Sequence, residues 1–103
     1  LTKTSDLKAI YAACGPPAAG AARAIANAGI APDAIQLVGF DFCCGEAEAL
    51  ADGLEDASIA QFPTKMAEYG VDALVKSIRG ETVPSLIDSG AALVTKENMD
   101  KFK

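Results

Sequence analysis

One carboxylate stands at the end of an apolar run, and its position points to ligand binding. The run extends from Ile35 to Gly39 and leads through Phe40 into Asp41. A strand that is buried on both faces has such a continuous apolar sequence, and open α/β sheets bind ligands just beyond the carboxyl ends of their strands. An ionised aspartate only accepts hydrogen bonds, so Asp41 suits the hydroxyl groups of a ligand. A purely structural role, in which Asp41 caps the following helix, is the alternative.

Other side chains that could contact a ligand lie near the same predicted edge of the sheet. Gln61 closes the next predicted strand, and its amide both donates and accepts hydrogen bonds, which suits a hydroxyl. Phe40, Phe42 and Phe62 flank the two polar residues. Aromatic faces can cover the C–H patches of a sugar ring or a polyol. Each of these residues also has an ordinary structural interpretation, as a strand-end glutamine or a core phenylalanine.

The three cysteines, Cys14, Cys43 and Cys44, follow two of the predicted strands. Adjacent parallel strands would bring them to one edge, where a disulfide from Cys14 to Cys43 or Cys44 would close a loop of about 30 residues. Such a bridge favours an oxidising compartment. Free thiols packed near the ligand are the second interpretation, and metal or redox chemistry is the third. No zinc site is expected, because the chain has neither Cys-x-x-Cys spacing nor histidine.

The composition excludes several classes of function. The chain has 103 residues, a net charge of −5 and no histidine. A negative chain without clustered Lys or Arg is not expected to bind nucleic acid. The lack of histidine removes the commonest general base and every Ser-His-Asp arrangement, and no cofactor is expected. No apolar run is long enough to span a bilayer, and the first residue, Leu1, predicts a processed or truncated piece of a longer protein.

The order of apolar runs and turn residues predicts an α/β fold with a parallel sheet and crossover helices. A short buried strand is expected at residues 8–13, with further strands at 35–39 and 57–61 and extended pieces at 83–88 and 91–95. Helices are expected at residues 16–28, 46–52 and 63–79, and the last of these has an apolar face. Gly20 is expected to pack closely against the sheet. Glu46 and Glu48 suit the positive end of the second helix. Three more acidic residues, Asp52, Glu55 and Asp56, are typical of solvated surface.

Several stretches, in this order and at these separations, resemble the carboxy-terminal part of a periplasmic sugar-binding protein of the ribose-binding type. They are residues 7–13, 20–25, 28–29, 35–41, 57–61, 78–81 and 87–98. The resemblance implies a type I periplasmic-binding-protein fold, in which three chain crossings join two α/β lobes. This chain would supply a partial lobe with a three-layer sheet. Residues 1–61 would be the carboxy-terminal part of the second lobe, and residues 62–103 the crossing helix and closing strands that return toward the missing first lobe.

The resemblance also implies roles for individual residues. Asp41 matches the aspartate that accepts hydrogen bonds from sugar hydroxyls, Phe40 lies beside it in the pocket wall, and Gln61 matches the glutamine at the hinge edge of the site. Cys14 and Gly15 stand where the family usually has an Asn-Asp pair whose asparagine binds sugar. A pentose other than ribose, a hexose or an open-chain polyol is therefore as plausible a ligand as ribose.

The function that follows from the resemblance is the non-enzymatic, solute-binding component of an ABC-type sugar importer. Its partners would be a sugar or polyol, the permease subunits and the missing amino-terminal lobe. Its location would be periplasmic, or extracellular as a lipid-anchored or secreted protein. The chain alone is expected to bind ligand weakly and to self-associate. The alternatives are the effector-binding portion of a sugar-responsive transcription regulator and, less favoured, a thiol-dependent redox protein that uses Cys43 and Cys44.

Overall fold

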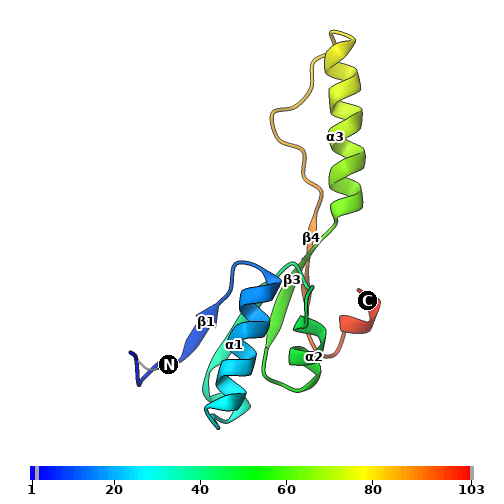
Figure 1. Ribbon diagram of the computed structural model, residues 1–103. Helices are drawn as coiled ribbons and strands as arrows, with labels where there is room; N and C mark the ends of the chain where they lie inside the picture. The colour runs from blue at the N-terminus through cyan, green and yellow to red at the C-terminus, as the bar shows by residue number, and fades with distance from the viewer. Residues whose placement is uncertain (2, 103) are drawn as a thin grey trace. The chain divides into compact units, whose positions relative to one another are not determined.

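The computed structural model describes residue 1 and residues 3–102, and it divides them into two compact units. The main unit comprises Leu1–Ala60 and Ala92–Lys103, and the helical unit comprises Gln61–Ala91. The elements in chain order (Figure 1) are β1 (Ala9–Tyr11), α1 (Gly15–Asn27), β2 (Gln36–Phe40), α2 (Glu46–Ala51), β3 (Ala57–Gln61), α3 (Pro63–Ile78) and β4 (Ala91–Val94), with short 3-10 turns at Pro32–Ala34 and Met99–Lys101.

The four strands form one sheet in the order β1-β2-β3-β4. The pairs β1–β2 and β2–β3 are parallel, with Ile10 opposite Leu37 and Gly39 opposite Ser58. The fourth strand runs back along β3, so the sheet is mixed (Figure 1). The expected α/β fold with crossover helices is confirmed, and β4 is the one departure from a fully parallel sheet.

The core of the main unit lies between the sheet and the helices α1 and α2. The first helix packs against both β2 and α2. The buried residues of this cluster are Ala22 and Ile25 from α1, Ile35 and Leu37 at β2, and Ala49 from α2. Gln36, Val38 and Phe40 alternate with the buried residues of β2 and are exposed or half-exposed. One face of the sheet is therefore covered, and the other remains partly open.

The limits of α1 agree with the sequence, but its glycine does not pack as expected. Pro16 and Pro17 lie in the first turn, where a missing N–H costs little, and Gly29 follows the helix with a left-handed φ of +66°. The prediction that Gly20 packs closely on the sheet is wrong. Gly20 is exposed, and a Cβ there would have no heavy atom within 4 Å.

A second buried cluster joins the carboxy-terminal residues to the main unit. It consists of Leu50, Ala60 and Val94, with Phe42, Met99 and Phe102 packed against them. The rings of Phe42 and Phe102 meet edge to face, with centroids 6.4 Å apart and an interplanar angle of 79°. Residues 92–102 thus pack with the amino-terminal sixty residues. The assignment of residues 62–103 to a crossing toward another lobe stays a prediction.

The helical unit contains α3, which ends within one residue of its expected limit. The extended piece expected at residues 83–88 is wrong, because the structure assigns no strand to this stretch. Pro84 removes one backbone donor, and the Gly90 N–H donates to Asp88 Oδ1 at 2.7 Å in a local turn. Several apolar side chains of α3, including Val71, Leu74 and Ile78, are exposed.

The first strand also differs from expectation. It has only three residues, and it lies at an edge of the sheet rather than in its interior. Tyr11 is 66% exposed, so the prediction of a buried strand at residues 8–13 is wrong. The apolar sequence of this stretch predicted the strand correctly but could not indicate how many neighbours it has.

Candidate functional site

The carboxyl end of β2 leads directly into a loop, residues 41–45, that we call the binding loop. Asp41 is its first residue and is half-buried. Its backbone N–H donates to Ile59 O at 2.8 Å, which extends the pairing of β2 with β3 by one residue. The helix α2 begins directly after Gly45. Asp41 therefore lies where the sequence placed it, at the rim formed by the carboxyl ends of the parallel strands.

The binding loop has an unusual backbone conformation. Three residues other than glycine have positive φ angles, +91° at Asp41, +49° at Phe42 and +60° at Cys44, and Gly45 has a φ of +104°. Such conformations cost about 1–3 kcal/mol per residue and persist only where the surroundings hold them in place. They also cluster at functional sites. The contacts of the loop must therefore supply the stabilisation that its own residues do not.

Two buried side chains supply these contacts. Glu46 Oε2 accepts a hydrogen bond from the Cys43 N–H at 2.6 Å, and Glu46 Oε1 accepts one from the Ser58 hydroxyl at 2.7 Å. Ser58 Oγ in turn accepts a hydrogen bond from the Phe42 N–H at 3.2 Å. Glu46 is 0% exposed, and Ser58 lies on the covered face of β3. A single network thus satisfies the two amides in the middle of the binding loop.

The first residue of α1, Gly15, packs against the binding loop. A Cβ on Gly15 would lie 2.6 Å from Cys43 Sγ, 2.7 Å from Glu46 Oε2 and 2.8 Å from Cys43 O, so only glycine fits there. Cys14, which precedes Gly15, is half-buried at the amino end of α1. The structure therefore brings Cys14 to the same edge as the binding loop. All three cysteines are free thiols, and the disulfide stays a prediction.

The Cys43 thiol of the binding loop is not set up to react as a nucleophile. The pKa of Cys43 is raised to about 11, first by a hydrogen bond with the Cys44 side chain, then by desolvation and by the negative charges of Glu46 and Asp41. A thiol with so high a pKa carries little thiolate at neutral pH, and the thiolate is the nucleophile. Among the described residues, no group of three or more His, Cys, Asp or Glu side chains is arranged to hold a metal ion.

The other predicted site residues, three phenylalanines and Gln61, lie in different parts of the structure. Phe40 ends β2 and is half-buried on the more open face of the sheet. Phe42 packs into the second cluster against Phe102, which is a core contact. Gln61 is the last residue of β3 and the first of the helical unit. Phe62, in the same unit, has the Lys65 amine 4.7 Å from its ring centroid. Their roles toward a ligand stay predictions.

Sequence reasoning missed the burial of one acidic side chain beside this site. Glu55 was expected on solvated surface, but it is only 2% exposed, so this expectation is wrong. Its carboxyl group reaches the space beside Gly39, where the Glu46 carboxyl group also lies. The alternation of β3 places Ser58 on the covered face, and a polar residue there is the one signal in the sequence that a buried partner exists.

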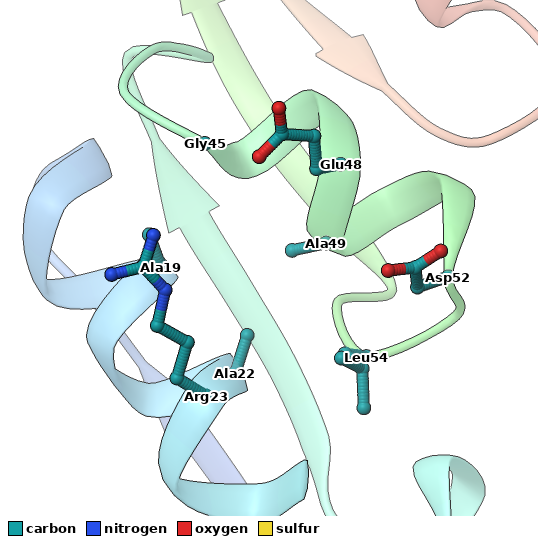
Figure 2. Close-up of a pocket in the computed structure, with 8 residues that line it drawn as sticks. All are labelled: Ala19, Ala22, Arg23, Gly45, Glu48, Ala49, Asp52 and Leu54. Atoms are coloured by element: carbon teal, nitrogen blue, oxygen red, sulfur yellow. The ribbon is translucent and has the colours of Figure 1, made fainter.

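A small groove lies between α1 and α2, and Asp41 is not among the residues that line it. Its volume is about 120 Å³, and Ala19, Ala22, Arg23, Gly45, Glu48, Ala49, Asp52 and Leu54 line it. Figure 2 shows Arg23 on the α1 side and the carboxylates of Glu48 and Asp52 on the α2 side. Small-molecule sites usually begin at about 300 Å³, so this groove is too small to be the main ligand site. Within the described residues, no helix is long and apolar enough to cross a membrane.

Comparison with known proteins gives consistent matches in sequence and in structure. The chain is 35% identical over 97 residues to the ribose import binding protein of Salmonella typhimurium, a match that covers 94% of this chain and 32% of that protein. The match to the ribose import binding protein of Escherichia coli is 34% identical over the same length. The chain thus spans about a third of the length of the curated relatives it matches.

Solved structures of solute-binding proteins share the fold. An ABC transporter solute-binding protein from Agrobacterium vitis with bound D-fucose is 40% identical, with a TM-score of 0.83, over 98% of this chain and 34% of that one. A second one from the same organism, bound with α-D-tagatopyranose, is 28% identical with a TM-score of 0.84, over 95% of this chain and 33% of that one. Residues 1–82 match the family described as the periplasmic binding protein domain, and the chain therefore belongs to that family.

Proposed function

We propose that this chain is part of the solute-binding component of an ABC-type sugar importer and that it supplies one side of the site for a monosaccharide or polyol. The observation that carries the proposal is the position of Asp41 at the carboxyl rim of the parallel strands, in a chain 35% identical to a ribose import binding protein. In open α/β sheets this rim is where ligands bind. A permease that receives the solute, and a periplasmic or extracellular location, belong to the same proposal.

In the proposed site, Asp41 accepts hydrogen bonds from ligand hydroxyls. Gln61 both donates and accepts, and Phe40 covers C–H groups of the ligand. Cys14 stands at the rim as a weak hydrogen-bond donor, which favours a ligand that needs no strong donor there. Phe42 contributes mainly through its packing on Phe102, because that contact fixes the binding loop to the second cluster. The rest of the site comes from an amino-terminal lobe, so this chain alone binds ligand weakly.

The ligand proposed is a pentose, a hexose or a polyol. Related solute-binding proteins have been solved with D-fucose, with α-D-tagatopyranose and with D-arabinose. All three are polyhydroxylated and uncharged, which agrees with a site whose main polar group here is one carboxylate. A thiol-dependent activity has less support, because the pKa of Cys43 is about 11. No feature of the described residues favours a transcription regulator over a transport protein.

The test uses a chimera in which residues 1–103 replace the matching third of the Salmonella relative. Calorimetric titration measures its binding of D-ribose, D-fucose, D-arabinose, D-tagatose and ribitol, with the chain alone measured in parallel. We expect at least one of these to bind the chimera much more tightly than the chain alone. Asp41→Asn should lower that affinity about tenfold to a hundredfold, because a hydrogen bond to a charged group is worth about 1.5–3 kcal/mol.

Asp33→Asn is the matched control, because Asp33 is exposed in the 3-10 turn that precedes β2, at the opposite end of that strand from Asp41. It should leave the affinity unchanged. If the chimera has a folded circular dichroism spectrum and binds none of the five compounds, the proposal fails. It also fails if Asp41→Asn and Asp33→Asn bind the sugar equally well.

A further inference from the structure

Two buried glutamates converge on one point beside the binding loop. A Cβ on Gly39 would collide with Oε1 of Glu46 and with Oε1 of Glu55, so both carboxyl oxygens occupy the space that the missing side chain leaves. Glu46 is 0% exposed and Glu55 is 2% exposed. The first comes from α2, and the second precedes β3. The two acidic groups are thus held together without access to bulk water.

The partners of the two carboxyl groups are unequal. Glu46 accepts hydrogen bonds from the Cys43 N–H and the Ser58 hydroxyl, so each of its two oxygens has a donor. Among the described residues, neither oxygen of Glu55 has a donor in good hydrogen-bond geometry, and the Gly39 backbone acts on this carboxyl group only as a smaller, opposing influence on its pKa. A buried carboxylate without a donor is costly, whereas a neutral carboxylic acid has an O–H of its own to donate. The acceptor available at the point of convergence is Glu46.

We propose that Glu46 and Glu55 form a carboxylate–carboxylic acid pair that positions the binding loop, and that loss of the shared proton to water loosens the loop. The O–H of Glu55 would donate to Glu46, which at the same time holds the Cys43 amide and, through Ser58, the Phe42 amide. If Glu55 lost its proton, two buried negative charges would meet beside Gly39 and repel each other. The repulsion would displace the Glu46 carboxylate from its two donors, the Cys43 N–H and the Ser58 hydroxyl.

The charges around the pair act in the same direction. Burial and then the negative charge of Glu46 raise the pKa of Glu55 to about 8, Asp56 adds to the shift, and the Gly39 backbone opposes it. Cys43 donates its backbone N–H to Glu46, and its thiol pKa is raised by Cys44, Glu46 and Asp41. No cation contributes to the shift of Glu55, so nothing among these groups compensates a second negative charge.

The first test follows the proton and the loop without any ligand. Carbon-13 NMR of the Glu55 carboxyl group in this chain should show a titration near pH 8. Amide hydrogen exchange should show that the protection factor of Cys43 falls about tenfold or more from about pH 6 to about pH 9, since each pKa unit of coupling corresponds to a factor of ten. Glu55→Gln keeps an N–H donor but cannot ionise, so the protection factor of the Cys43 amide in this variant should not change with pH.

Glu48→Gln is the matched control, because Glu48 is an exposed glutamate of α2, the helix that carries Glu46. It should show the same fall in protection as the unchanged chain. If Glu55 titrates near its usual value of 4.5, or if the protection of Cys43 is equally independent of pH with and without Glu55→Gln, the pair does not exist as described. The carboxyl titration needs no variant, so the outcome does not depend on whether Glu55→Gln folds.

The second test concerns binding and rests on the proposed function. The chimera described above is titrated with the sugar it binds, at the same two pH values. Affinity should fall about tenfold at the higher pH, and Glu55→Gln should remove this dependence. A pH-dependent loop in a protein that binds none of the sugars would support the pair and refute the proposed function. If the sugar binds with an affinity that does not change with pH, the claim that the pair affects ligand binding is wrong.

Discussion

Gly39 occupies a position on β2 where the two buried carboxyl groups leave no room for a side chain. Both glutamates and Ala18 would contact a Cβ at this point, with Ala18 Cβ at 3.0 Å. A glycine in a strand often marks such a close approach rather than a turn. Here the glycine is the reason that the Glu46–Glu55 pair can lie under the covered face of the sheet.

Gly39→Ala should therefore destabilise the protein by about 1–3 kcal/mol, the usual cost of overpacking a buried site. Gly20→Ala should instead stabilise it by about 0.5–1 kcal/mol, because Gly20 lies in a helix with open space around it. Urea unfolding followed by circular dichroism measures both. Equal stabilities for the two variants would contradict the packing described around Gly39.

The raised pKa of Glu55 predicts that stability depends on pH. Between the unfolded value of 4.5 and the folded value of about 8, the folded protein holds a proton that the unfolded chain has lost. The free energy of unfolding should therefore fall as the pH rises through this window, by up to about 1.4 kcal/mol for each pH unit. Unfolding in urea at several pH values tests this, and the slope should be smaller in Glu55→Gln than in Glu48→Gln.

At the scale of single residues, the sequence predicted part of the site. The apolar run before Asp41 placed that residue correctly, because the run encodes a strand and the strand's end fixes the rim. The burial of Glu46 and Glu55 was not predictable, since a glutamate in a first helical turn or next to a turn is usually solvated. Contacts formed only in the folded protein distinguish these two from Glu48: the approach of both to Gly39, and the hydrogen bond of Glu46 with Ser58.

At the scale of elements, the order of strands and helices was predictable and their environment was not. The limits of α1, β2, β3 and α3 agree with the sequence, because prolines, glycines and apolar periodicity determine them locally. The periodicity of α3 predicted an apolar face, and Met66, Val75 and Ile78 on that face are exposed. Periodicity shows that a helix has an apolar face but not which surface covers it.

Two leucines in different helices should therefore respond differently to truncation. Leu50 in α2 is 0% exposed and belongs to the second cluster, whereas Leu74 in α3 is 61% exposed. Leu50→Ala should cost about 2–5 kcal/mol of stability, and Leu74→Ala should change it by less than about 0.5 kcal/mol. Thermal and urea unfolding measure both. A large effect of Leu74→Ala would show that α3 packs on something that the described residues do not reveal.

At the scale of the whole molecule, the sheet has an unprotected edge. Among the residues that the structure describes, β1 pairs only with β2, so its other side is an open edge of the sheet, and its Tyr11 is largely exposed. Exposed edge strands pair readily with other chains. In the family to which the chain belongs, the matched relatives are about three times as long, so this edge is one place where further segments could pack.

We expect the isolated chain to self-associate through β1 as its concentration rises. Sedimentation velocity should show a mass above that of the monomer, and Tyr11→Lys should shift the equilibrium toward monomer, because a lysine on an edge strand opposes pairing. Leu86→Lys is the control, since Leu86 is also exposed but lies in the stretch without strands. Association that only Leu86→Lys weakens would place the contact in the helical unit instead.

The neighbouring places of β3 and β4 in the sheet have a consequence for protein engineering. The chain leaves the main unit at Gln61 and returns to it at Ala92, on the strands β3 and β4, which lie side by side and run in opposite directions. The intervening segment is thus equivalent to an insertion into a β-hairpin. Replacing residues 62–90 by a tight Asn-Gly turn should close that hairpin and retain both buried clusters. The result would be a minimal scaffold that carries the rim and its loop.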